Sequence, residues 1–173
     1  MSTSNLSLSG SAIIDALHRS EVEYVLSVPD ISTSEGLLYP IAEDERFRLI
    51  RVCKEDEAVG IAAGLSYRNK RALILIQHTG FLDSINAIRG VAVEYQLPIC
   101  MMIGLLNKEP EVLPSRSNVY GVKITEPILD VMGIRRDLIN NNADVARISP
   151  AIEYAYKFSQ PLAFLLGRSP LAS

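Results

Sequence analysis

Two groups of side chains in this sequence could carry out acid–base chemistry. The first is the acidic run Glu55-Asp56-Glu57, and the second is a single histidine, His78. Carboxyl and imidazole groups transfer protons near neutral pH when their surroundings tune the pKa. A structural interpretation competes with this one, because acids are favoured at a helix start and a lone histidine often only packs. Composition alone favours the structural interpretation for both groups.

Asp30 and Cys53 are weaker candidates for chemistry. Asp30 follows Pro29, a pair that is typical of a turn. Cys53 could form a thiolate near a helix start, but no histidine is adjacent to activate it. Cys53 and Cys100 are flanked by strand-like sequence, so we expect both to be buried free thiols. Phosphate-binding glycine loops, the GxSxG nucleophile elbow and zinc-ligand spacings do not occur.

Size and charge restrict the class of protein. At 173 residues the chain has the length of one domain, and we expect a single domain over residues 1–173. A net charge of −3 argues against nucleic acid as a partner, because binding phosphates requires a basic surface. The longest apolar run, residues 97–106, is too short to cross a membrane, and residues 1–10 lack the pattern of a signal peptide. We therefore expect a cytoplasmic protein with neither nucleic acid nor membrane as a partner.

The acidic run must be positioned by a helix that it opens. Ala58, Ile61 and Leu65 recur at helical spacing and share one face. Gly60 and Gly64 lie one turn apart, and glycine inside a helix costs roughly 1 kcal/mol relative to alanine. Two such glycines predict that another backbone or a flat ligand approaches this helix closely.

The rest of the chain alternates between strand and helix patterns. Strands are predicted over residues 24–28, 47–52, 72–76, 98–103 and 161–166. Further helices are predicted over residues 9–20, 33–41 (capped by Thr33 or Ser34), 82–95, 125–132 and 144–159. A long loop is predicted over residues 107–121 and a turn over residues 137–142. This order indicates an α/β, doubly wound fold with a mostly parallel sheet and helices on both faces. The alternating basic residues of the second strand place it towards a sheet edge.

Polar residues are concentrated where strands end. Residues 27–34, 53–57 and 77–86 each follow a predicted strand. Ligands of open parallel sheets bind at the carboxyl ends of the strands. We therefore expect these three segments to converge on one site.

The same segments carry a resemblance to a known family. Glu55 is followed at fixed offsets by Ala58, Ala62, Ala63 and Gly64. This pattern resembles the pyrimidine-binding (PYR) domain of thiamine diphosphate-dependent decarboxylases, and is most similar to the small split-chain group of sulfopyruvate and phosphonopyruvate decarboxylases. The resemblance covers almost the whole chain. Its shared segments are residues 27–30, 55–64, 77–86, 97–98 and 125–133.

The resemblance implies an activity and roles for particular residues. It implies a subunit of a 2-oxoacid decarboxylase in which Glu55 binds N1′ of the cofactor's aminopyrimidine and favours the imino tautomer that deprotonates C2. His78 and Asp30 would assist proton transfer or orient the substrate. The resemblance also assigns cofactor contacts, besides Glu55, to Pro29, Gln77, Thr79, Gly80 and Asn86.

The resemblance further implies that the active site is shared with another chain. The GDG motif and the later asparagine that hold the diphosphate through Mg²⁺ in this family do not occur here. Magnesium requires oxygen ligands in octahedral geometry, so a diphosphate-binding β-type subunit would hold the metal and this chain would supply no metal ligand. We expect an α2β2 assembly, in which Gly60 and Gly64 allow helices of neighbouring subunits to approach. The loop 107–121, with Arg116, could close over an anionic 2-oxoacid.

Two departures from the family pattern leave the substrate open. His78 replaces an asparagine, and Leu82 stands where the family has a second glycine. The resemblance is therefore also compatible with a carboligating thiamine diphosphate enzyme. A non-catalytic α/β binding or regulatory module is a further alternative.

Overall fold

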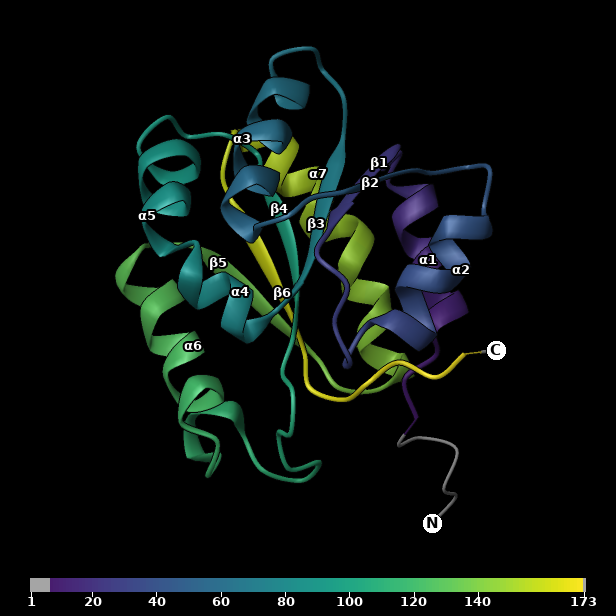
Figure 1. The fold of residues 1–173 in the computed structure, drawn as a ribbon, viewed down its shortest axis with the longest axis vertical. Coiled ribbons are helices and arrows are strands. Elements are labelled where there is room, and N and C mark those ends of the chain that lie inside the picture. The colour runs from purple at the N-terminus through teal and green to yellow at the C-terminus, as the bar shows by residue number, and fades with distance from the viewer. Residues whose placement is uncertain (1–6, 173) are drawn as a thin grey trace.

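The structure is a computed structural model in which residues 7–172 are described, and its centre is a six-stranded parallel sheet (Figure 1). The strand order is β2-β1-β3-β4-β6-β5, and every neighbouring pair is parallel. The strands are β1 (Tyr24–Ser27), β2 (Arg48–Arg51), β3 (Ala72–Gln77), β4 (Cys100–Gly104), β5 (Arg135–Ile139) and β6 (Leu162–Leu166). The predicted α/β class with a parallel sheet and flanking helices is confirmed.

Helices cover both faces of this sheet. The α-helices are α1 (Gly10–Arg19), α2 (Tyr39–Glu43), α3 (Glu55–Ser66), α4 (His78–Asp83), α5 (Ile85–Ala87), α6 (Tyr120–Val131) and α7 (Ile148–Phe158). Two π-helical segments, η2 (Ser34–Leu38) and η3 (Ile88–Val93), and two 3₁₀ segments, η4 (Pro114–Arg116) and η5 (Asn142–Arg147), complete the elements. Figure 1 shows α1, α2 and α7 on one side of the sheet and α3, α4, α5 and α6 on the other.

The central strand β3 contributes to two hydrophobic cores. Successive side chains of a strand point to opposite faces. Leu73 and Leu75 therefore pack in the core formed with α1, α2 and α7, while Ile74 and Ile76 pack in the core formed with α3, α4 and α6. This double burial explains why the strand reads as an unbroken apolar run.

The two edge strands differ in how visible they are in the sequence. The predicted edge strand appears as β2, in which Arg48 and Arg51 are exposed. The opposite edge strand, β5, was missed, and the turn predicted over residues 137–142 is wrong because it overlaps this strand. Arg136 of β5 pairs with Glu126 and Asp130 of α6 at 2.7 and 2.9 Å. A charged edge strand has no apolar run, so hydrophobic pattern does not reveal it.

Three helix starts differ from the predictions. Helix α4 begins at His78, directly after β3, whereas a turn was predicted before a helix at residue 82. Helix α6 begins at Tyr120, five residues before the predicted start at residue 125, and it includes Pro127. The predicted caps Thr33 and Ser34 are also wrong, because Thr33 forms no side-chain cap and Asp30 accepts the backbone hydrogen bonds at this position.

Gly36 of η2 allows a close backbone contact with Pro170, whereas the close contact predicted at Gly60 and Gly64 of α3 is not found among residues 7–172. A methyl group on Gly36 would lie 2.5 Å from the carbonyl carbon of Pro170. A methyl group on Gly60 or Gly64 would meet no atom within 4 Å among residues 7–172. The close approach expected at α3 therefore does not occur within the described part of this chain. Across residues 7–172, no helix combines the length and the apolar composition required to cross a bilayer.

We predict opposite effects of two glycine-to-alanine substitutions. Gly36→Ala should lower the free energy of unfolding by about 1–3 kcal/mol, because the added methyl overpacks a backbone contact. Gly60→Ala is the matched control and should raise it by up to about 1 kcal/mol, because alanine is the better helix former. Urea denaturation of both variants measures the difference. A Gly36→Ala variant as stable as Gly60→Ala would contradict the packing described here.

Candidate functional site

The predicted site residues follow three neighbouring strands of the sheet. Strand β1 pairs with β2 on one side and with β3 on the other. Asp30 follows β1, Glu55 follows β2 and His78 follows β3, all at the carboxyl edge. Helices α3 and α4, which begin after β2 and β3, are in contact. The fold therefore brings the three predicted segments together, as the sequence indicated.

Glu55 and Gly80 form the contact on which this edge is built. Glu55 is the first residue of α3 and is half-buried. A methyl group on Gly80 of α4 would lie 2.5 Å from Cδ of Glu55, so a larger residue would displace this carboxylate from its present position. Among residues 7–172 the Glu55 carboxylate has neither a hydrogen-bond partner nor a salt-bridge partner. It is a positioned carboxylate whose bonding capacity is free for a ligand.

The two neighbouring acids are committed to the structure of the helix start. Glu57 Oε2 accepts hydrogen bonds from the backbone nitrogens of Cys53 and Lys54 at 2.9 and 3.4 Å, as in a capping box. Asp56 lies 3.7 Å from Lys54 Nζ, and the same ammonium lies 3.6 Å from Asp83 at the end of α4. These two carboxylates raise the pKa of Lys54. Lys54 thereby links the start of α3 to the end of α4, and Glu55 alone remains available.

His78 is buried where α4, β4 and α6 meet. Its side chain is only 4% exposed, and Nδ1 has no hydrogen-bond partner among the described residues. A methyl group on Gly121 would lie 2.8 Å from Nε2 of His78. Burial lowers the pKa of His78, and this effect exceeds the opposing effects of the Gly104 backbone and the Asp30 carboxylate. The imidazole is therefore neutral at pH 7.

Asp30 is fully engaged in hydrogen bonds. Oδ1 accepts bonds from the backbone nitrogens of Ser32 and Thr33 at 2.7 and 3.0 Å and from Ser32 Oγ at 2.5 Å. Oδ2 accepts a bond from Thr33 Oγ1 at 2.6 Å. Ser32 also packs on Gly104, where a methyl group would lie 3.1 Å from Ser32 Cβ. Asp30 thus holds the segment after β1 against the end of β4.

The remaining predicted cofactor contacts are less closely grouped. Thr79 Oγ1 donates to Gln77 Oε1 at 2.8 Å, close to Gly80 in the chain. Pro29 lines a shallow hollow of about 360 Å³ with Asp30. Asn86 is exposed, and its Oδ1 accepts hydrogen bonds from Arg89 at 3.1 and 3.3 Å. No hydrogen bond joins Asn86 to Glu55 among residues 7–172.

The expectation of two buried thiols is half correct. Cys100 lies inside β4 and is buried, which raises the pKa of its thiol to about 12. Cys53 is exposed, because β2 ends at Arg51 and Cys53 falls in the connection to α3. Sequence reasoning also passed over Ser32 and Gly104, which position Asp30. The Asp-x-Ser-Thr spacing at residues 30–33 is the signal that could have identified this cap.

The edge can therefore hold a ligand through a carboxylate and exclude water through a buried imidazole. No group of three or more histidine, cysteine or acidic side chains suited to a metal occurs within residues 7–172. One free carboxylate beside a glycine can accept a hydrogen bond from a ligand, but it supplies fewer oxygen ligands than Mg²⁺ or Ca²⁺ requires.

The family model for the thiamine pyrophosphate enzyme N-terminal TPP-binding domain matches residues 9–107. The chain belongs to this family. The match includes β1 to β4 and thus every predicted site residue, among them Glu55, Gly80 and His78.

Relatives of known name agree with this family. The chain is 32% identical to the sulfopyruvate decarboxylase subunit alpha of Methanocaldococcus jannaschii over 155 residues, which covers 89% of this chain and 90% of the relative. It is 32% identical to the subunit of the same name from Methanococcus maripaludis over 92 residues, covering 53% and 54%. The corresponding values for Methanothermobacter thermautotrophicus are 25% over 108 residues, covering 62% and 65%. Because all three are named alpha subunits, the relatives imply a partner subunit.

We predict that His78 makes the stability of the chain depend on pH. Below pH ~6.5 the unfolded state binds a proton at this position and the folded state does not, so the free energy of unfolding should fall as pH falls. The decrease ends once the pH passes the lowered pKa of the folded state. His78→Asn should remove up to about 1.4 kcal/mol per pH unit from this slope. Urea denaturation between pH 5 and 7.5 measures it, and identical slopes in the two proteins would contradict the burial described.

Proposed function

We propose that this chain is the alpha-type subunit of a thiamine diphosphate-dependent 2-oxoacid decarboxylase, with sulfopyruvate or a similar anionic 2-oxoacid as substrate. Membership of the thiamine pyrophosphate enzyme family supports the cofactor, and the names of the relatives support the reaction. The observation that carries the proposal is the free Glu55 carboxylate held against Gly80 at the carboxyl edge.

Glu55 is the residue that would receive the cofactor. Its carboxylate would hold a proton at N1′ of the aminopyrimidine. Because Gly80 has no side chain, it leaves room for that carboxylate. When bound, the cofactor supplies the electron sink for loss of carbon dioxide. Gln77 and Thr79, which precede Gly80 in the chain, would contact the same ring. Asn86, which is held by Arg89, supports this role least.

His78 and Asp30 would prepare the site rather than bind the aminopyrimidine. The neutral imidazole of His78 fills the space between α4 and α6 and carries a proton on one ring nitrogen without bringing a charge into the site. Asp30 uses both oxygens on Ser32 and Thr33, and its role is to position the segment that borders the site. A direct proton transfer by Asp30 would require one of these bonds to break.

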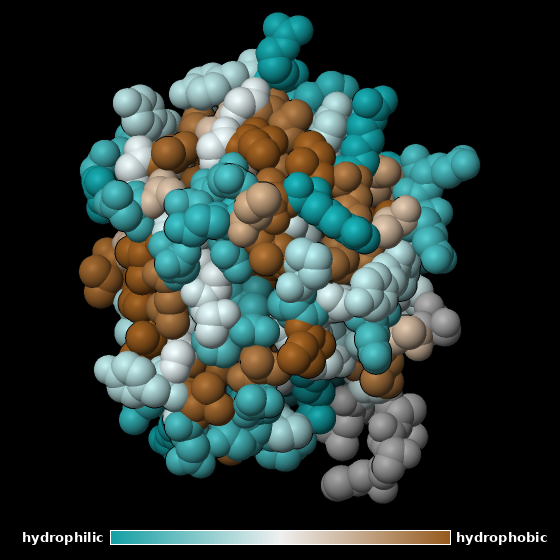
Figure 2. All heavy atoms as spheres, in the orientation of Figure 1, coloured by the Kyte–Doolittle hydropathy of each residue, from teal (hydrophilic) through white to brown (hydrophobic). Residues whose placement is uncertain are grey.

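A partner of the β type would hold the diphosphate and Mg²⁺ in an α2β2 assembly. The absent GDG motif and the alpha-subunit names of the relatives support this arrangement. Figure 2 shows hydrophobic side chains gathered over α3 and between α5 and α6. The second area is a wholly apolar hollow of about 460 Å³ lined by Ile85, Ile124, Pro127, Ile128, Val131 and Met132. Exposed apolar surface of this kind is typical of interfaces.

The two free thiols fit a reducing cytoplasm, where we place the complex.

The decisive experiment compares the chain alone with the chain co-expressed with a candidate β-type subunit that carries the GDG motif. We expect weak binding of thiamine diphosphate by the chain alone, and tight binding together with carbon dioxide release from sulfopyruvate by the complex. In the complex, Glu55→Gln should lower the rate of carbon dioxide release by about 10²–10⁴-fold while assembly is unchanged. Calorimetry and a coupled carbon dioxide assay supply the two measurements.

Asp56→Asn is the matched control, because Asp56 is adjacent and, among residues 7–172, pairs with Lys54 alone. An active Glu55→Gln complex would overturn the role of Glu55. Full turnover by the chain alone would overturn the shared site. Product analysis separates decarboxylation, which yields an aldehyde, from carboligation, which yields a larger hydroxyketone.

We predict that Gly80→Ala separates activity from folding. The added methyl would push the flexible Glu55 side chain out of position while α4 retains its backbone. We expect at least a tenfold loss of carbon dioxide release by the complex and a change in the free energy of unfolding below about 1 kcal/mol. Enzyme assay and urea denaturation measure the two. A fully active Gly80→Ala complex would show that the carboxylate does not need this position.

A further inference from the structure

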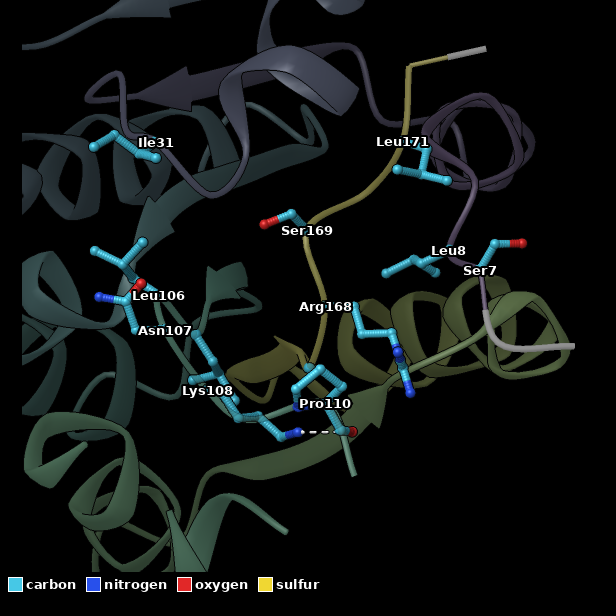
Figure 3. A pocket seen from close by; sticks show the side chains of 12 residues that line it. Ser7, Leu8, Ile31, Leu106, Asn107, Lys108, Pro110, Arg168, Ser169 and Leu171 are labelled. Carbon is cyan, nitrogen blue, oxygen red and sulfur yellow. Dashed lines mark hydrogen bonds between the residues drawn. The ribbon is translucent and has the colours of Figure 1, made fainter. Parts of the chain in front are cut away.

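A second hollow at the carboxyl edge lies beyond β3, between the loop that follows β4 and the segment that follows β6 (Figure 3). It has a volume of about 490 Å³. Its polar side chains include Asn107, Lys108, Arg168 and Ser169. Figure 3 shows Lys108 and Arg168 on either side of Pro110, and Ile31 on the opposite side of the hollow. Ile31 also lines the hollow beside Asp30, so the two hollows adjoin.

Lys108 is a buried cation without a carboxylate partner. The residue is 8% exposed, and its Nζ donates to the carbonyl oxygens of Glu109 and Pro110 at 2.8 and 3.4 Å. An ammonium group has three N–H donors, so one remains unused. No carboxylate oxygen of the described residues lies within 4 Å of Nζ. The nearby Glu109 carboxylate instead accepts bonds from Ser117 Oγ and Asn118 N at 2.7 and 3.0 Å.

Arg168 also has unused capacity to donate. Its Nη2 pairs with Glu111 Oε1 at 2.5 Å, but the Glu111 side chain is 74% exposed and the pair lies at the surface. Its Nε is buried and has no partner among residues 7–172. Burying a cation or an N–H donor without a partner is unfavourable. The side chains of Lys108 and Arg168 therefore line one hollow, and each has an N–H donor that no acceptor among residues 7–172 uses.

We propose that this hollow binds a small tetrahedral oxyanion, such as a sulfonate, a phosphonate or sulfate, through donors of Lys108 and Arg168. A guanidinium group matches such an anion with several donors, and an ammonium group supplies a compact charge. Ser169 and Asn107 provide further polar groups at the wall. Burial also lowers the pKa of Lys108, an effect that a bound anion would oppose.

The anion has two possible sources with the same chemistry. One is the acidic tail of the substrate, an interpretation that rests on the proposed function and on the adjoining hollow beside Asp30. The other is a free inorganic anion that binds and stabilises the loop after β4. One arm of the experiment tests whether the hollow binds an anion, and a second arm tests whether that anion is the substrate's acidic tail.

The first arm uses the full chain and needs no activity. Thermal unfolding is followed during titration with sodium sulfate, with sodium chloride keeping the ionic strength constant. A ligand that binds only the folded state raises the midpoint in a saturable way, whereas the general salting effect of sulfate does not saturate. We expect a saturable rise for the wild type and an apparent Kd at least tenfold weaker in Lys108→Met and in Arg168→Gln.

Two further variants distinguish the site from general charge. Glu111→Gln releases Arg168 from its surface pair and should bind sulfate several-fold more tightly. Lys123→Gln removes an exposed cation of α6 that does not line the hollow and should respond like the wild type. If Lys108→Met does not fold, Arg168→Gln and Glu111→Gln test the site from opposite directions. No saturable response in the wild type, or equal responses in all variants, would overturn the proposal.

The second arm uses the complex with the β-type subunit. If the anion is the sulfonate of the substrate, Lys108→Met should raise KM for sulfopyruvate at least tenfold and leave kcat within about twofold. An unchanged KM with saturable sulfate binding in the first arm would assign the site to a free anion. If the complex lacks decarboxylase activity, the proposed function fails, and the first arm still decides whether the anion site exists.

Discussion

The carboxyl edge of the sheet depends on the approach of one carboxylate to one helix backbone. Glu55 at the start of α3 lies against Gly80 in α4, and no larger residue at position 80 would leave that space. The parallel order of β2, β1 and β3 creates this approach, because the helices that follow the two outer strands emerge side by side. Burial of the sheet on both faces holds the strands in this order, so the core positions the carboxylate.

The three acids at residues 55–57 have different partners, although they are adjacent in the sequence and chemically alike. Glu57 caps its own helix, Asp56 pairs with Lys54, and Glu55 has no partner in the described chain. The structural interpretation that composition favoured is therefore correct for two of the three acids. The third is free because it begins the helix on the side facing α4. Of the three acids, Glu55 is therefore the one whose carboxylate can bind a ligand.

The two proposed sites use opposite charges on one edge of one sheet. Glu55 offers an anionic group near β2 and β3, whereas Lys108 and Arg168 offer cationic groups near β4 and β6. The segment after β1 lies between them, because Asp30 fixes Ser32 against Gly104 and Ile31 borders the second hollow. A molecule with a heterocycle at one end and an acid at the other would find complementary groups along this edge.

The sequence by itself determined the elements that rest on local pattern. The buried strands, the amphipathic helices, the α/β class and the family motif around Glu55 are all readable, because side-chain periodicity and fixed offsets are properties of the chain. The features that depend on contacts between residues far apart in the sequence became visible only in the tertiary structure. The charged strand β5 is held in the sheet by its pairing with β6, and the imidazole at the start of α4 is buried against Gly121 of α6. The burial of Lys108 beside Arg168 likewise joins residues 60 positions apart, a proximity that no local spacing encodes.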